Sequence, residues 1–488
     1  MLFNSIEFLV FFPIVGCLYF LLTGRWRWGL LLVASYLFYM AWEPAYALLI
    51  LASTVVDYCV ALWMSATESR AKRRFYLGVS LVCNLGLLFT FKYFNFVSAS
   101  MTALLEGLGF AQALPTLHVL LPVGISFYTF QTLSYTIEVY RGRQEPERHF
   151  GIFALYVSFF PQLVAGPIER SYNLLPQLHE TCRFDYDRVV AGMRMILWGL
   201  FKKVVIADRL GVFVDHIYDT PSAYTGPSLA LATLCFTYQI YCDFSGYSDI
   251  AIGCARIFGM DLMTNFNRPY QARSLAEFWR RWHISLSSWF RDYLYIQLGG
   301  NRVSRVRWHG NILIVFGLSG LWHGASWTFL AWGLVHASYL LTSRATAGWR
   351  RGLASRIGLT RLPRAHALWQ NAFTFILVAL AWIFFRANTL RDAGEVFARL
   401  LRGWSVLLTP AGWLDTLHVG RIAPTELLLT LALVALLEGS ERLQGAADIN
   451  SLLTRMPGWG RWTFYAALGL AIMNLGVTLE IPFVYFQF

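Results

Sequence analysis

The chain has 488 residues, of which 57% are hydrophobic and only 14% are charged. A soluble protein carries about 25% charged residues, so this chain cannot cover itself with a water-facing surface. The apolar excess extends to both termini, which excludes a soluble enzyme with a membrane tail. The net charge is +12, and the basic residues cluster between apolar runs, as in the cytoplasmic loops of membrane proteins. We therefore do not expect nucleic-acid binding.

The seven cysteines have no CxxC or histidine-pair spacing, and most lie inside apolar runs. We interpret them as small core residues and expect neither a disulfide framework nor a metal site. The sequence also contains no HExxH, GxSxG, Walker or GxGxxG motif, and we expect no bound cofactor.

The apolar runs, taken in chain order, predict the membrane-embedded elements. The first run, near 8–22, has no basic region before it and no cleavage site after it, so we interpret it as a retained span. Further runs lie near 28–42, 45–64, 75–91, 116–137, 150–168, 191–207, 225–242, 308–342, 371–385, 427–437 and 462–479. The sequence thus predicts an all-α, polytopic integral membrane helical bundle with about eleven spanning or re-entrant elements, since a crossing helix needs about 20 apolar residues.

We expect a single membrane domain. Its predicted parts are N-terminal spans (1–115), a motif-bearing catalytic core (116–342), a basic cytoplasmic loop (343–367) and C-terminal spans (368–488). The loop carries six arginines and no acidic residue. An excess of basic residues favours the cytoplasmic side.

The charges around the first spans predict the orientation of the chain. Glu7 precedes the first apolar run, and Arg25 and Arg27 follow it. The next basic cluster, 70–74, comes after two more runs, which places both basic clusters on the same side. The positive-inside rule therefore predicts an extracytoplasmic N-terminus.

The first candidate functional residue is His323, in a run without formal charge over 312–342. Thirty-one residues form a helix of about 46 Å, which exceeds the bilayer core, so Gly320 and Gly324 are expected to mark a break or a close approach. Burial there would keep the imidazole neutral and able to accept a proton. The alternative is a histidine that bonds to a neighbouring carbonyl in a packed bundle.

The second candidate is His283, in the segment 278–295. Taken as one helix, this segment places Trp279, Trp282 and His283 on an apolar face opposite Arg281, as in a helix that lies in the membrane interface. A polar ring on an apolar face needs a partner or a function. The alternative is an interfacial helix whose histidine has no role in chemistry.

The third candidate is the pair Asp243 and Asp249, which lie in an apolar context on either side of Gly246. Gly246 predicts a broken helix, and we favour a structural role in which one carboxylate holds an arginine or a histidine. His336 follows His323 in the same apolar run, but a continuous helix would separate the two by about 20 Å. We therefore do not expect these histidines to form one site.

Several motifs in the chain resemble those of the membrane-bound O-acyltransferase family, in its bacterial alginate O-acetyltransferase-like branch. They are Pro122-Val-Gly-Ile-Ser-Phe127, Ala165-Gly-Pro167, Asp243-Phe-Ser-Gly-Tyr-Ser-Asp249, Phe278-Trp-Arg-Arg-Trp-His-Ile-Ser-Leu-Ser287, Arg291-Asp-Tyr-Leu-Tyr295, Leu298-Gly-Gly-Asn-Arg302 and Gly320-Leu-Trp-His-Gly324. The resemblance implies a helical bundle around a central acyl-transfer tunnel. It also implies that His323 is catalytic and that His283 is a second functional position.

The resemblance further implies a function in the bacterial inner membrane. The protein would move an acetyl group from cytosolic acetyl-CoA across the membrane for O-acetylation of an extracytoplasmic, alginate-like polysaccharide or of peptidoglycan. An extracytoplasmic SGNH-type acetyltransferase is the implied partner, and the glycan is the acceptor.

The chemistry of acyl transfer suggests roles for these residues. A hydroxyl acceptor attacks poorly until a base takes its proton, and a neutral His323 suits that task. His283, Asn301 or a tryptophan N–H could donate to the thioester oxygen. Further candidates to bind substrate or line the tunnel are Trp279, Trp282, Trp322 and Asp243. The competing hypothesis is a transporter or flippase that uses His323, Asp243 and Asp249 for coupling.

Overall fold

The computed structural model describes all residues except 25, 111–112, 419–422, 445–448, 478–482 and 485–488. Across the described residues the regular structure is helical, without a strand, which confirms the all-α prediction. The chain divides into two compact units. Unit 1 contains residues 1–196 and 247–263, and unit 2 contains residues 197–246 and 264–488.

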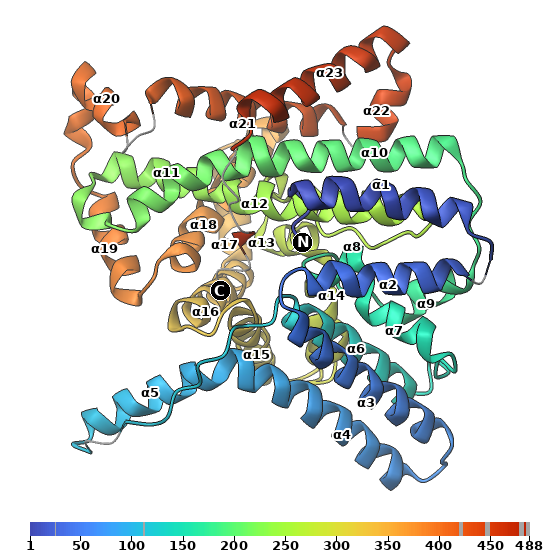
Figure 1. Cartoon of the computed structure of the whole chain (residues 1–488). Coiled ribbons are helices and arrows are strands. Elements are labelled where there is room, and N and C mark those ends of the chain that lie inside the picture. The colour runs from blue at the N-terminus through green and yellow to red at the C-terminus, as the bar shows by residue number, and fades with distance from the viewer. Residues whose placement is uncertain (25, 111–112, 419–422, 445–448, 478–482, 485–488) are drawn as a thin grey trace. The chain divides into compact units, whose positions relative to one another are not determined.

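Unit 1 is built from the N-terminal helices. These are α1 (Ile6–Leu21), α2 (Trp26–Met40), α3 (Ala47–Ser65), α4 (Arg70–Leu88), α5 (Phe94–Gly107), α6 (Ile125–Tyr140), α7 (Phe150–Ser158), α8 (Phe160–Leu163), α9 (Ser171–His179) and most of α10 (Tyr186–Leu200). Helices α3, α4 and α6 lie side by side (Figure 1). A buried polar cluster joins them, in which Asp57 accepts hydrogen bonds from Ser80 at 2.6 Å and from Asn84 at 3.0 Å.

Unit 2 contains the remaining helices. These are α11 (Asp208–Tyr218), most of α12 (Gly226–Ile257), α13 (Leu275–Arg281), α14 (Ile284–Phe290), α15 (Arg305–His323), α16 (Trp327–Ala345), α17 (Ala347–Arg356), α18 (Pro363–Arg386), α19 (Leu390–Leu400), α20 (Pro410–Leu417), α21 (Pro424–Gln444), α22 (Ile449–Arg455) and α23 (Gly458–Leu475). Two π-helical turns, Phe201–Ala207 and Arg291–Tyr295, extend α10 and α14.

The core of unit 2 is rich in tryptophan. Trp282, Trp332 and Trp382 are fully buried. The Trp332 and Trp382 rings stack with their centroids 5.5 Å apart, and the Trp282 ring lies 5.0 Å from Trp382. Large aromatic side chains bury much apolar area with few rotatable bonds. This cluster therefore fixes α16, α18 and the α13–α14 junction against one another.

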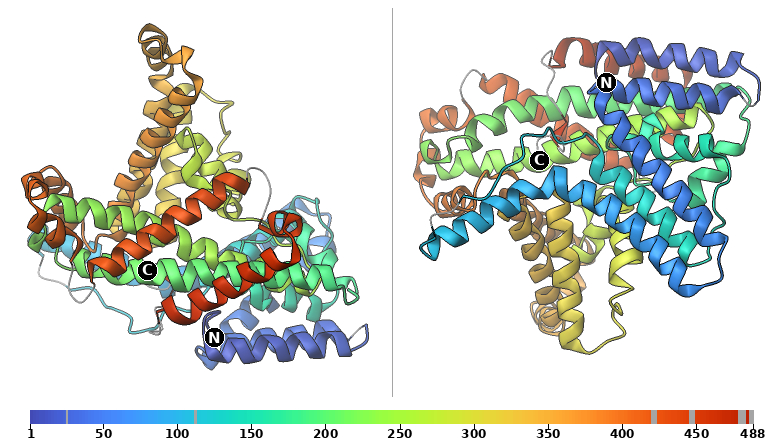
Figure 2. Two further views of the ribbon diagram at one scale, coloured as in Figure 1. Left: turned by 90° about the horizontal axis from the view of Figure 1, so that it is seen from above. Right: turned by 60° about the horizontal axis from the view of Figure 1, so that its bottom comes forward.

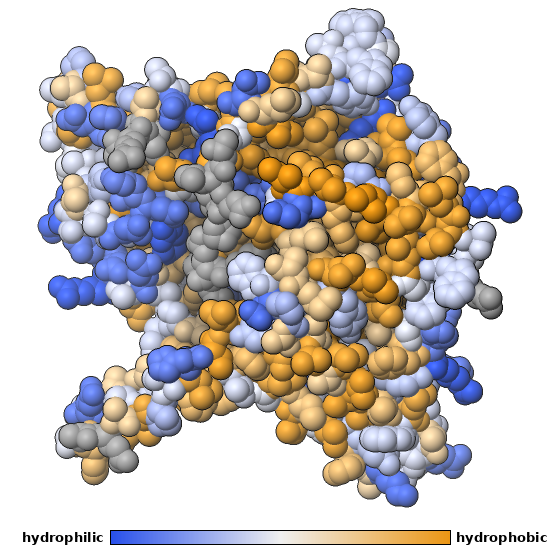
Figure 3. Space-filling model, in the orientation of Figure 1, coloured by the Kyte–Doolittle hydropathy of each residue, from blue (hydrophilic) through white to orange (hydrophobic). Residues whose placement is uncertain are grey.

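Apolar residues are exposed on helices of unit 1, as expected for contact with lipid. Figure 3 shows hydrophobic residues gathered over α1, α3 and α4, where Ile6, Leu48 and Val82 are each at least 67% exposed. By length and composition, three described helical segments could cross a membrane: Pro44–Ser65, Arg70–Gly107 and Pro363–Arg386. The total number of spans remains a prediction.

The long apolar run near 308–342 forms two helices, which confirms the predicted break. Helices α15 and α16 run side by side as an antiparallel pair (Figure 2). They approach closely at Gly320 and Gly333, where an added Cβ would lie 2.2 Å from the carbonyl oxygen of Phe329 or Phe316, respectively. Small residues permit such close contact between membrane helices.

Candidate active site

His323 is the last residue of α15, and its side chain is 2% exposed. The helix ends there because Gly324 is extended, with φ −159°. Helix α16 begins after Ser326, whose hydroxyl oxygen accepts a hydrogen bond from the Thr328 amide at 3.3 Å. The turn between the helices therefore presents His323 within the core of unit 2.

Aromatic rings surround His323. The ring centroids of Trp322 and Trp332 each lie 5.0 Å from that of His323, and that of Phe385 lies 5.4 Å away. All three residues are buried. His323 thus lies in an aromatic environment. Its role as a proton acceptor stays a prediction.

His283 lies at a break between two short helices, so the prediction of one amphipathic helix over 278–295 was wrong. Helix α13 ends at Arg281, Trp282 is extended, and His283 has a left-handed backbone with φ 42° before α14 begins. A positive φ is uncommon for a residue other than glycine and is maintained only where neighbouring structure enforces it.

The enforcing structure is the segment 265–267, which precedes α13. The Ile284 amide donates to the Asn265 carbonyl, and the Asn267 amide donates to the Arg281 carbonyl, both at 2.9 Å. These bonds satisfy backbone groups on both sides of the break, which a continuous helix would have satisfied internally. His283 is consequently turned into the core, where it is 1% exposed.

The structure brings the two predicted histidines together. The ring centroids of His283 and His323 lie 6.2 Å apart, and the Trp322 ring lies 5.7 Å from His283. Trp282 is fully buried in the adjoining tryptophan core. Two buried imidazoles therefore share one aromatic environment, although one ends α15 and the other lies at the break between α13 and α14.

Asn301 is not brought to these histidines. It is exposed and precedes α15, whereas His323 is at the other end of that helix, about 27 Å away along the axis. The prediction that Asn301 donates to the thioester oxygen is therefore not supported by its position. Asn311 is the buried asparagine of this region, and it donates to the backbone oxygens of Leu298 and Gly300 at 3.2 Å.

Asp243 forms a buried ion pair with Lys203 at 2.7 Å, and Lys203 also contacts Asp208 at 2.7 Å. A carboxylate that holds a cation matches the structural role favoured from the sequence, although the cation is a lysine. The predicted helix break was wrong, since α12 is continuous through Gly246. An added Cβ at Gly246 would lie 2.7 Å from the Gly199 carbonyl oxygen, so this glycine serves close helix packing.

His336 is nearer to His323 than a continuous helix would allow, because α15 and α16 fold back on each other. The Trp332 ring contacts both, with its centroid 5.0 Å from that of each histidine. The two histidines are thus no farther apart than the sum of these distances. His336 is fully buried and its ring also packs 5.0 Å from Trp279.

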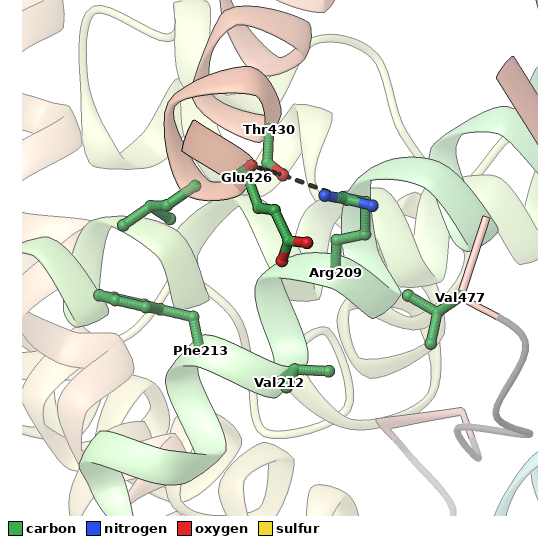
Figure 4. A pocket seen from close by; sticks show the side chains of 7 residues that line it. Arg209, Val212, Phe213, Glu426, Thr430 and Val477 are labelled. Atoms are coloured by element: carbon green, nitrogen blue, oxygen red, sulfur yellow. Dashed lines mark hydrogen bonds between the residues drawn. The ribbon is translucent and has the colours of Figure 1, made fainter. Parts of the chain in front are cut away.

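A cavity of about 400 Å³ adjoins this cluster, lined by residues of α13, α14 and α15. Trp279 lines it together with Phe316, Ser319, Arg280 and Arg291, and Arg291 is paired with Asp292 at 2.7 Å. A second, smaller pocket of about 100 Å³ lies between α11 and α21, where Arg209 donates to Thr430 at 3.2 Å (Figure 4). Its lining contains none of the predicted residues.

The sequence interpretation missed three residues that shape this site. They are Asn265, which contacts His283, Lys203, which pairs with Asp243, and Trp332, which packs against His323. Lys203 could have been noticed, because a lysine within an apolar run needs a partner. The other two give no local signal, since an asparagine in a loop and a tryptophan in an apolar helix are ordinary. Among the described residues, no group of three or more His, Cys, Asp or Glu could hold a metal ion.

Comparison with known proteins identifies the family. The MBOAT, membrane-bound O-acyltransferase family matches residues 147–387, which include His283 and His323. The "Probable alginate O-acetylase AlgI" of Pseudomonas putida is 37% identical over 503 residues, which cover 100% of both chains. The chain belongs to this family. It is an O-acyltransferase of the membrane-bound, alginate O-acetylase-like branch.

Two further relatives show how far the similarity extends. The "Probable alginate O-acetylase AlgI" of Pseudomonas aeruginosa is 39% identical over 434 residues, which cover 88% of this chain and 81% of the relative. The "Peptidoglycan O-acetyltransferase" of Helicobacter pylori is 37% identical over 428 residues, which cover 81% of this chain and 79% of the relative. Relatives of this O-acyltransferase thus carry the names of two different acceptor polymers.

The close approach of α15 and α16 leads to a stability prediction. Gly320→Ala places a methyl group 2.2 Å from the Phe329 carbonyl oxygen, and such overpacking typically costs about 1–3 kcal/mol. We expect a lower thermal unfolding temperature in detergent and reduced acyl transfer, because the helix that ends at His323 must shift. Gly310→Ala on the same helix is the control, since its Cβ meets no atom within 4 Å. Equal unfolding temperatures for the two variants would contradict the prediction.

Proposed function

We propose that this O-acyltransferase moves an acetyl group from cytosolic acetyl-CoA across the membrane for O-acetylation of an extracytoplasmic glycan. The glycan is an alginate-like polysaccharide or peptidoglycan, as named for the relatives. The observation that carries the proposal is the pair of buried histidines, with ring centroids 6.2 Å apart. A second acetyltransferase of SGNH type, on the outer side, is the proposed partner that passes the group to the glycan.

In the proposed reaction, His323 acts as the general base. It takes the proton of the acceptor hydroxyl as that oxygen bonds to the thioester carbon, and the CoA thiolate leaves with the electron pair of the C–S bond. The aromatic rings of Trp322, Trp332 and Phe385 exclude water from the imidazole. Exclusion of water limits hydrolysis of the thioester.

The cavity beside Trp279 supports a CoA thioester as donor. Its apolar wall, which includes Phe316, suits the pantetheine arm, and Arg280 can attract a phosphate group. Moving only the acetyl group also leaves the charged CoA on the cytoplasmic side, which avoids the cost of a charge in the bilayer. The direction of transfer therefore depends on the orientation of the chain.

Radiolabelled acetyl-CoA tests the proposed function. The purified protein in proteoliposomes would be supplied with labelled acetyl-CoA and with either oligomannuronate or peptidoglycan fragments, with and without the SGNH-type protein. We expect label on the glycan when the partner is present and none with a His323→Ala variant. Release of free acetate without label on the glycan or the partner would contradict the proposal. Movement of glycan without acetyl transfer would favour the transporter hypothesis.

The proposed direction of transfer predicts the sidedness of three positions. We expect Lys72→Cys and Arg351→Cys, each in a cysteine-free background, to resist an impermeant maleimide added to intact cells, whereas Glu43→Cys reacts. The basic residues at 70–74 and in 343–367 favour the cytoplasm. Glu43 is separated from the cluster at 70–74 by the predicted span 45–64, which places it on the opposite side. Labelling of position 72 or 351 from outside would overturn both the orientation and the direction of transfer.

A further inference from the structure

Asn265 is a buried polar residue beside His283 that the proposed reaction does not yet use. Its side chain is 1% exposed. Its Oδ1 lies 2.6 Å from the Ser285 hydroxyl oxygen and 3.3 Å from Nδ1 of His283. Its backbone carbonyl also accepts a hydrogen bond from the Ile284 amide at 2.9 Å. Both the main chain and the side chain of Asn265 are therefore bonded at the turn that positions His283.

The hydrogen bond from Ser285 identifies which end of the amide faces His283. The Ser285 hydroxyl donates to Oδ1 of Asn265 at 2.6 Å, a distance typical of an O–H···O bond. The same oxygen faces Nδ1 of His283. An amide oxygen only accepts, so Nδ1 is the nitrogen that bears the proton in the neutral ring, and Nε2 has the lone pair.

We propose that Asn265 is a positioning residue that holds His283 as the Nδ1–H tautomer, so that Nε2 of His283 accepts a proton during acyl transfer. This rests on the proposed function and decides between the two roles left open for His283, since a ring with its proton on Nδ1 has no Nε2–H to donate to the thioester oxygen. His323 takes the proton of the acceptor hydroxyl, and the neighbouring His283 Nε2 receives it. The bond from Nδ1–H to Asn265 persists and stabilises the imidazolium formed.

The ionisable neighbours of His283 define what a pH experiment reports. His323 on α15 is the titratable group in ring contact with it. Helix α12 contacts His283 through Phe244, at 4.7 Å between centroids, and the adjacent Asp243 is paired with Lys203. The segments that meet at the break carry the charged residues Arg268, Arg273, Glu277, Arg280 and Arg281, of which Arg281 and Glu277 pair at 2.7 Å. Asn265 is not a member of the Asp243–Lys203 pair or of the Glu277–Arg281 pair.

The pH dependence of transfer tests the proposal. Asn265→Asp puts a carboxylate beside Nδ1–H, and an opposite charge at this distance typically raises a pKa by about 1–3 units. A base works only when deprotonated, so the acidic limb of the kcat/KM profile should move to higher pH by about one unit or more. A merely structural change would lower activity equally at all pH values. An acidic limb that coincides with that of the wild type would overturn the proposal.

Asn267→Asp is the matched control. It makes the same chemical change in the same segment, but Asn267 is exposed. At the break it bonds to Arg281 through its backbone amide and carbonyl groups. We expect its pH profile to match that of the wild type. A limb shifted equally in both variants would indicate a general effect of added negative charge and would overturn the specific role of Asn265.

The tautomer can be measured without acyl transfer. Nitrogen-15 NMR of ring-labelled histidine, with the His283 signals identified by their loss in His283→Gln, should show protonated Nδ1 in the wild type and a mixture of tautomers in Asn265→Ala. A His283 signal from the Nε2–H tautomer in the wild type would overturn the role of Asn265 even if the enzyme transfers acetyl groups. Absence of transfer by the wild type would instead overturn the proposed function, and with it the proton-accepting step.

Discussion

His323→Ala should reduce acetyl transfer by about 100-fold or more, since general base catalysis typically contributes 10²–10⁴-fold. The substitution removes an imidazole that packs against Trp332 and Phe385 and leaves the backbone of α15 unchanged in composition. We therefore expect membrane insertion and yield close to those of the wild type. The measurement is the initial rate of label transfer from acetyl-CoA by purified, monodisperse protein.

Two further variants separate chemistry from packing at this position. His309→Ala makes the same change on the same helix, but His309 is exposed near the start of α15, and its activity should be unchanged. His323→Gln refills most of the space that the imidazole occupied but provides no useful base. We expect it to be as inactive as His323→Ala. A His323→Ala enzyme that keeps more than about a tenth of wild-type turnover would exclude the general-base role.

The second large effect is expected at His283. We expect kcat of His283→Gln to fall at least about ten-fold. Glutamine retains hydrogen bonding, but its amide does not act as a base as an imidazole does. His283→Ala should lose at least as much, and it also removes the side chain that contacts Asn265 and Phe244. The measurement is kcat and KM for acetyl-CoA in both variants.

The comparison of these two variants distinguishes the roles of His283. If the alanine variant is inactive and the glutamine variant is close to wild type, His283 is a hydrogen-bond donor or a structural residue, and its proton transfer is excluded. Thermal unfolding in detergent reports whether the turn at Trp282 and His283 is intact. An unfolding temperature near that of the wild type assigns the loss of turnover to the ring itself.

Parts of this site were predictable from local sequence. The run around His323 is too long for one crossing helix and contains Gly320 and Gly324, so a break next to the histidine followed from length and composition. The break at His283 was not predictable in this way, because the residues around it have helical periodicity. Backbone bonds from Asn265 and Asn267, earlier in the chain, stabilise the turn instead. Tertiary hydrogen bonds thus outweighed local helix preference.

The sequence by itself determined that this protein is a helical membrane protein and that His283 and His323 belong to acyltransferase motifs, because hydropathy and motif spacing are properties of contiguous residues. Only the tertiary structure decided that these rings lie 6.2 Å apart, that Lys203 holds Asp243 and that Asn265 faces Nδ1 of His283. Each of these facts joins segments that are not adjacent in the chain. Periodicity records how a segment buries one face, whereas the partner it meets there depends on how distant helices pack.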